Sequence, residues 1–363
     1  MTLEKHRAIS PSQAVHDVIA PELPERVRWH RLLLLTAAAM GVTAVVTTLL
    51  IFIDPVQITG QNGWYKPLKF AISISVYSVS LSWLIGLLRR GRRAAEIAGT
   101  VSAIALLIEM VIIVGAAAVG TTSHFNVSTP LHVVMLTVMA VSPVVIWAMD
   151  LVVAIAVIVN PGTDHARNLT VRAATLVGLI GMGLGSLMVF PTAQQLDGGG
   201  VVGAHAVGVP DGGVGLPVLG WSTVGGDLRI PHFVGMHALQ LLPMLLLALE
   251  LVARHIPMLR DGVLRLRLMW IATIALSAVV VVLTWQAMIG QSIVARAGAI
   301  LVAGCAMLLG TIIAIFASVQ AARAVESRVS QDRLDDAIDD EQMVLDAADL
   351  LPSGRALRER DSC

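Results

Sequence analysis

Residues 99–120 read GTVSAIALLIEMVIIVGAAAVG, an apolar run in which Glu109 is the single charged residue. A helix needs about 20 apolar residues to cross a bilayer. Runs of this kind recur along the chain, at about 32–53, 67–88, 99–120, 131–159, 173–190, 232–253, 268–289 and 297–322. The pattern predicts an all-α, polytopic transmembrane helical bundle with about eight spans.

The composition favours a membrane protein over a soluble domain. Of the 363 residues, 56% are hydrophobic and 14% are charged, and the mean hydropathy is +0.79. Soluble domains carry about 25% charged residues. The formal net charge is zero, and the basic residues are spread over short loops instead of forming one basic surface. We therefore expect the lipid bilayer as a partner and no nucleic acid.

The basic residues also predict the orientation. If the amino terminus is cytoplasmic, the outer side carries four of the 25 Lys and Arg, namely Lys66, Lys69, Arg229 and Arg296, which leaves 21 inside. Cytoplasmic loops of membrane proteins carry an excess of Lys and Arg. We expect both termini in the cytoplasm. The abundance of Arg, Ala and Val favours a bacterial cytoplasmic membrane.

Three regions are expected: a cytoplasmic segment 1–31, a transmembrane domain 32–322 and an acidic cytoplasmic tail 323–363. The tail sets acidic residues among apolar ones at loosely helical spacing, which predicts an amphipathic helix that is solvated or docks a partner. The external loop 191–231 is rich in glycine, and its apolar residues predict a folded cap. A small-residue face in the fifth run predicts close helix packing, within the bundle or in a homo-oligomer; it consists of Gly178, Gly181 and Gly185.

Histidines form a second pattern, because five of the ten collect near the outer side: His124, His132, His205, His232 and His237. Neutral imidazole binds haem iron and transition metals. We consider a cofactor site made of His124, His132 and His237, with Gln240 orienting His237, or a metal site that uses His232 and His237. The alternative is that these histidines are hydrogen-bond links between spans. The nature of any cofactor stays open.

Glu109 is the main candidate for chemistry inside the membrane, since a carboxylate there is costly and usually functional. It either relays protons or contacts a substrate, or it bonds hydroxyls of the second run, at Ser73, Ser75, Ser78 or Ser82. Asp150 is either a similar intramembrane group or a helix-end residue near the cytoplasmic interface, and we favour the second interpretation.

Cations at the outer interface suggest a place for a substrate. Lys66 and Lys69 lie beside aromatic residues in GWYKPLKF, residues 63–70. They are either interfacial anchors or contacts for a small-molecule or anionic substrate or a lipid head group. With the amino terminus in the cytoplasm, Asn126, Asp227 and Arg229 lie on the same outer side. We expect them to line one outer-leaflet cavity with the two lysines, as further substrate contacts.

Five motifs resemble a family of bacterial multi-pass membrane proteins with no assigned activity. They are WYKPLKF at 64–70, SHFN at 123–126, GAHAVG at 203–208, GDLR at 226–229 and HFVGMHALQ at 232–240. The resemblance covers about residues 50–245 and implies the membrane class alone. Three functions stay open: an oxidoreductase-like or metal-dependent protein with an outer histidine site, a proton-coupled small-molecule transporter using Glu109, and a structural or assembly protein. Whether the protein is an enzyme is left undecided.

Overall fold

The computed structural model describes residues 27–190, 195 and 202–349. Within them, seven helices are long and apolar enough to cross a membrane: α2 (Arg31–Ile53), α3 (Tyr65–Gly86), α4 (Arg92–Ala118), α5 (Pro130–Ile158), α6 (His165–Leu184, extended by η1, Gly185–Met188), α9 (Gly262–Met288) and α10 (Gly298–Asp349). The chain is therefore an all-α polytopic membrane protein, as predicted.

A bent pair of helices is the candidate for an eighth span. Helices α7 (Arg229–Met236) and α8 (Ala238–Val252) are together long and apolar enough to cross a membrane, but they are bent by 45° at His237. The sequence predicts one continuous run there. The 3-10 helix η3 (Pro257–Arg260) then leads into α9.

Side-chain caps fix the starts of several helices. His30 accepts a hydrogen bond from the first turn of α2, and Thr129, Asp164 and Asp261 do the same for α5, α6 and α9. These bonds satisfy backbone N–H groups that have no partner within the helix. Helices α4 and α6 start before the predicted apolar runs, since a helix can continue into its polar flanks.

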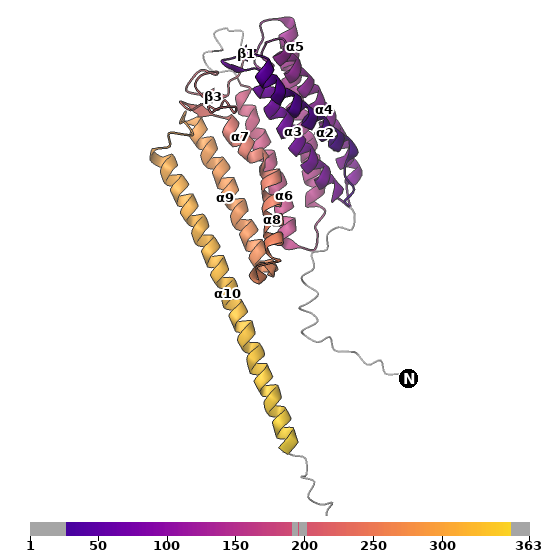
Figure 1. Cartoon of the computed structure of the whole chain (residues 1–363), viewed down its shortest axis with the longest axis vertical. Coiled ribbons are helices and arrows are strands. Elements are labelled where there is room, and N and C mark those ends of the chain that lie inside the picture. Colours follow the sequence, from indigo (N-terminus) through magenta and orange to yellow (C-terminus); the bar gives the residue numbers. More distant parts are fainter. Residues whose placement is uncertain (1–26, 191–194, 196–201, 350–363) are drawn as a thin grey trace, which may run out of the picture. The chain divides into compact units, whose positions relative to one another are not determined.

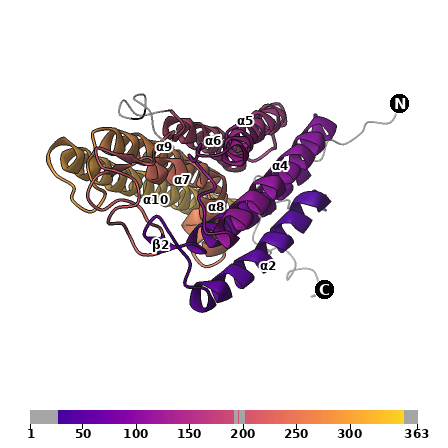
Figure 2. The ribbon, with the colours of Figure 1, turned by 90° about the horizontal axis from the view of Figure 1, so that it is seen from above.

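The helices α2 to α9 lie side by side as a bundle (Figures 1 and 2). Helix α2 packs on α3, α3 on α4, α4 on α5, and α5 on α6, while α6 also packs against α7, α8 and α9. Outward-facing side chains are apolar, for example Leu35 at 66% exposure and Phe52 at 84%. Such faces suit contact with lipid.

The glycine face of α6 permits the closest helix contact. A Cβ at Gly181 would collide with the backbone of Gly235 and Met236 in α7, whereas a Cβ at Gly178 would make ordinary contacts. The predicted close packing is thus confirmed within the bundle.

Short strands build a cap at one end of the bundle (Figure 1). Strand β1 (Gln57–Ile58) pairs with β2 (Gln61–Asn62), and β3 (Ala206–Val207) pairs with β4 (Gly226–Asp227), both antiparallel. Residues 202–228 are therefore folded, as predicted, while 191–194 and 196–201 lie outside the described residues.

The chain divides into two compact units at Ile312, within α10. In the second unit, the described residues continue α10 to Asp349, which includes the helical part predicted for the tail. Residues 1–26 and 350–363 of the predicted terminal regions lie outside the described residues.

Candidate functional site

Three cations meet at the cap, and we call Lys66, Lys69 and Arg229 the outer cation cluster, after the side of the membrane on which the sequence predicts them. Lys69 Nζ donates to the carbonyl oxygen of Leu219 at 2.8 Å, and Arg229 Nη2 donates to that of Gly220 at 2.6 Å. Lys69 and Arg229 lie close enough to Lys66 for their charges to act on it. The predicted cationic contacts therefore come together.

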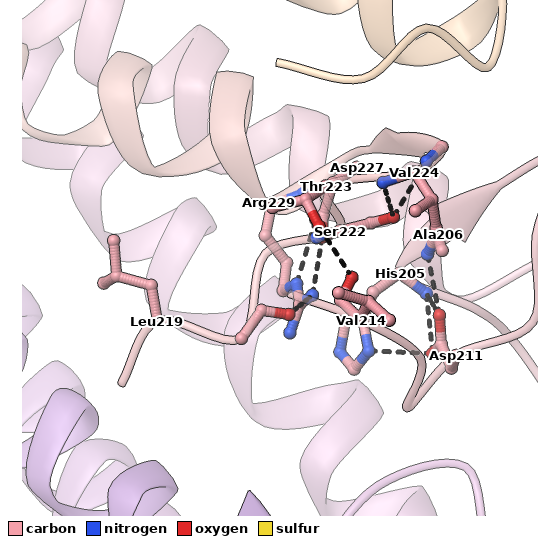
Figure 3. A network of polar contacts seen from close by, with 12 residues as sticks. His205, Ala206, Asp211, Val214, Leu219, Ser222, Thr223, Val224, Asp227 and Arg229 are labelled. Atoms are coloured by element: carbon pink, nitrogen blue, oxygen red, sulfur yellow. Dashed lines mark hydrogen bonds and ion pairs between the residues drawn. The ribbon is translucent and has the colours of Figure 1, made fainter. Parts of the chain in front are cut away.

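One carboxylate, that of Asp227, balances part of this charge. It is 2% exposed and accepts from Arg229 Nε at 2.9 Å and from the backbone N–H of Ser222 at 2.8 Å (Figure 3). These bonds fix the guanidinium in one position. The cluster sets three basic side chains against the one carboxylate of Asp227, which suits an anion.

His124 lies against the ammonium group of Lys66, with Nζ 2.8 Å from Nδ1. An ammonium group has only hydrogens to donate, so Nδ1 is the acceptor and the ring proton is on Nε2. Burial, and then the charges of Lys66 and His205, lower the pKa of His124 well below its usual value. The ring is therefore neutral at physiological pH.

His205 ties the cap together through Asp211 (Figure 3). The carboxylate of Asp211 accepts from the His205 ring at 2.9 Å and from the backbone N–H of Ala206 at 2.7 Å. Burial alone would raise the pKa of Asp211, but the hydrogen bonds and charge of His205 lower it to about 2. Burial also lowers the pKa of His205. The Phe125 ring lies 4.8 Å from that of His205, between ring centres.

We expect the cap to loosen as the pH falls. The folded pKa of His205 lies below the ordinary value of 6.5, so the opened segment binds a proton that the folded one does not. Stability is therefore lost as the pH falls through 6.5 towards the folded pKa. The stability contributed by Asp211 is present above its ordinary pKa of 3.8 and is lost only as the pH falls towards about 2.

Hydrogen exchange checks this prediction. The protection of the amides of Ala206 and Leu228, corrected for intrinsic exchange, should decrease between neutral pH and about pH 5. Leu228 donates to the carbonyl oxygen of His205. The amide of Gly63, which closes the β1–β2 hairpin onto Val56, serves as the control and should keep its protection. An equal loss of amide protection at Gly63 and at Ala206 and Leu228 would contradict the role of His205.

The other predicted ligands have separate partners. His132 bonds Thr121 through Nε2 and Thr129 through Nδ1, and His232 Nδ1 donates to the carbonyl oxygen of Gly181 in α6. His237 Nδ1 lies 3.1 Å from Gln240 Oε1, the contact that the spacing predicts. Within the described ranges, no three or more His, Cys, Asp or Glu side chains are grouped so that they could hold a metal ion.

Asn126 serves a local turn, because its Oδ1 accepts from the backbone N–H of Ser128 at 2.9 Å. The structure thus brings Lys66, Lys69, Asp227 and Arg229 together at the cap. It gives Asn126 a bond within its own loop.

Glu109 lies inside the bundle and is 5% exposed. Ser142 of α5 is beside its carboxyl group, but Oε1 accepts no hydrogen bond from any described residue. The alternative, that a serine of α3 bonds Glu109, is not what the described residues show. Ser75 donates to the carbonyl oxygen of Ala37, and Ser82 bonds the backbone of His30. The hydroxyls of Ser73 and Ser78 bond none of the described residues.

Asp150 is a second carboxyl group inside the bundle. Its Oδ1 accepts a hydrogen bond of 2.6 Å from the Tyr77 hydroxyl, and both residues are 6% exposed. The interpretation of Asp150 as a helix-end residue is therefore wrong, because it lies within α5 and faces α3. The signal for it was its flanks, which are apolar on both sides like those of Glu109.

The chain matches no protein-family model, no curated protein and no solved structure.

Proposed function

We propose that the protein is a proton-coupled transporter of a small anion. The observation that carries this proposal is the carboxyl group of Glu109, which is buried among spanning helices with one oxygen that accepts no hydrogen bond from the described residues. Buried ionisable groups in membrane spans mark proton and substrate paths.

The outer cation cluster is the proposed binding site for the anion. The ammonium groups of Lys66 and Lys69 bond neutral acceptors, an imidazole and a backbone carbonyl. An anion can replace such acceptors and gain stronger, charge-assisted bonds. Asp227 holds the guanidinium of Arg229 in place, and the remaining N–H groups can donate hydrogen bonds to the anion.

Glu109 is the proposed proton carrier. An ionised carboxylate without full hydrogen bonding is costly in an apolar interior, and a bound proton removes most of that cost. When a proton and an anion move together, less net charge crosses the apolar region. Coupling needs an anion site and a proton-binding group in one bundle, and the cation cluster and Glu109 are the residues that we propose for these two roles.

The break at His237 supports a transporter more than a static scaffold. Discontinuous helices in the middle of a bundle are typical of secondary transporters, where they line substrate sites. Here α7 is fixed to α6 by the bond from His232 to Gly181, whereas α8 continues at a 45° angle.

We further propose that the cap faces outwards and that both termini are cytoplasmic, in a bacterial cytoplasmic membrane. The four Lys and Arg at the cap end, against 21 elsewhere in the sequence, support this orientation.

Uptake by proteoliposomes tests the proposed function. Vesicles with an acidic exterior are offered labelled acetate, lactate, phosphate and sulfate in turn. At least one of these anions should accumulate, and dissipation of the pH gradient should stop it. If none of them accumulates although the protein is folded, the proposal fails for simple inorganic and carboxylate anions.

Lys69→Gln should weaken uptake of the transported anion. Loss of one charge-assisted hydrogen bond is expected to raise the anion concentration for half-maximal uptake about tenfold, which corresponds to about 1.4 kcal/mol. The control is Arg296→Gln, which removes an exposed cation from the loop between α9 and α10. Equal effects of the two variants would argue against a specific cation cluster.

A further inference from the structure

A small cavity adjoins Asp150 and Tyr77 deep in the bundle. Its volume is about 20 Å³, and its polar lining comes from Tyr77 of α3, Asp150 of α5 and Thr175 of α6. A water molecule needs about 10–15 Å³ measured in this way and two to four polar partners. The cavity therefore has room and hydrogen-bonding groups for one water.

The lining groups can hold such a water. The Tyr77 hydroxyl uses its hydrogen on Asp150 Oδ1, so its oxygen can still accept. The Thr175 hydroxyl donates to the carbonyl oxygen of Val171 and likewise can still accept. The second carboxyl oxygen of Asp150 completes a set of three oxygen atoms around the cavity.

We propose that Asp150, Tyr77 and one water in this cavity form a second proton-binding site inside the bundle. This site would be part of the proton coupling proposed above. Its role in transport rests on that proposal, whereas the binding of a proton at the site does not. The reaction is the binding of one proton to an Asp150 oxygen. A proton from solution reaches the water as H3O+; one O–H bond of this ion breaks as the O–H bond at Asp150 forms, which leaves a neutral water, and release of the proton is the reverse transfer.

The position of this site complements that of Glu109. Helix α4 ends at the cap and α5 starts there, so Glu109 lies in the half of α4 near the cap and Asp150 in the far half of α5. A proton that crosses the bundle from the cap would therefore meet Glu109 first and Asp150 second. The two carboxyl groups are then successive binding sites.

The break in the eighth span borders the cavity. Met236 and Leu239, one on each side of His237, both line it. A change in the bend between α7 and α8 would therefore alter the cavity and the contact of its water with Asp150. In this proposal, the bend between α7 and α8 controls proton exchange at Asp150.

Few titratable groups face Asp150. Tyr77 faces it from α3, and Glu109 of α4 is near enough to Tyr77 for its charge to act there. Among the described residues that line the cavity, α6 and the bent pair contribute Thr175 and otherwise glycine, leucine and methionine. Variants of Asp150, Tyr77 and Glu109 therefore suffice to assign a pH-dependent signal to this site.

Infrared titration of the reconstituted protein tests the proposal directly. The C=O stretch of protonated carboxyl groups is recorded against pH for the wild type, Asp150→Asn and Glu109→Gln. One titrating band should disappear in Asp150→Asn and persist in Glu109→Gln. The control is Asp261→Asn, at an exposed helix cap that asparagine preserves; it should leave that band unchanged.

Two further variants keep the test informative if Asp150→Asn fails to fold. Tyr77→Phe should change the frequency and the midpoint of the Asp150 band, and Thr175→Val should change its response to exchange into heavy water. A wild type with no titrating band assignable to Asp150 would overturn the proposal. If the band titrates but no anion is transported, the transporter proposal fails and the proton-binding site stands.

Discussion

Glu109→Gln is expected to abolish proton-coupled uptake of the anion. Glutamine keeps the shape of the side chain but cannot release a proton, so gradient-driven accumulation should fall by about a hundredfold or more, an effect typical of removing a proton-transfer group. Binding of the anion at the outer cation cluster should persist, since Lys66, Lys69 and Arg229 are unchanged. Accumulation and equilibrium binding are measured on the same preparation.

The matched control is Glu96→Gln on the same helix. Glu96 pairs with Arg92 at 2.8 Å, and its side chain is 46% exposed. Glu96→Gln is the same chemical change outside the apolar core. This variant should transport the anion like the wild type. Wild-type accumulation by Glu109→Gln would remove Glu109 from the transport mechanism.

Gly181→Ala is expected to cause the largest loss of stability. The added methyl group would collide with the backbone of Gly235 and Met236, and backbone cannot move aside as a flexible side chain can. Overpacking of this kind typically costs about 1–3 kcal/mol, and separation of α6 from α7 would also weaken the bond from His232 to Gly181. We expect a loss at the upper end of that range in reversible unfolding in detergent.

Gly178→Ala provides the comparison, because it lies on the same face of α6 and an added Cβ there keeps 3.7 Å from its nearest neighbour, the carbonyl oxygen of Met236. The same substitution should therefore be nearly neutral. Equal destabilisation at the two positions would contradict a specific contact between α6 and α7, because replacing Gly by Ala on its own favours the helix.

The helices were predictable because a bilayer imposes a length and a composition on each span. Helix α4 contains residues 99–118 of the run around Glu109, and the glycine face of α6 does mediate close packing. The break at His237 was not predictable, since an apolar run does not show where the helix bends. Pro243 lies within α8, after the break.

The pairing of polar residues could be predicted only in part. Gln240 contacts His237 because two residues that are three positions apart on a helix lie on the same face. The contact of Lys66 with His124 spans 58 residues, and that of Tyr77 with Asp150 spans 73. Such pairs depend on which helices are neighbours and how each is rotated, and one sequence does not contain that information. The apolar flanks of Asp150 did indicate a group inside the bundle, but its pairing with Tyr77 could not be predicted from them.

The central claim, that anion and proton move together, is tested by the internal pH of proteoliposomes. Vesicles without a pH gradient enclose a pH-sensitive dye, and the transported anion is added outside. The account predicts acidification of the interior as the anion enters, in fixed proportion to it. Entry of the anion with no change in internal pH would contradict proton coupling.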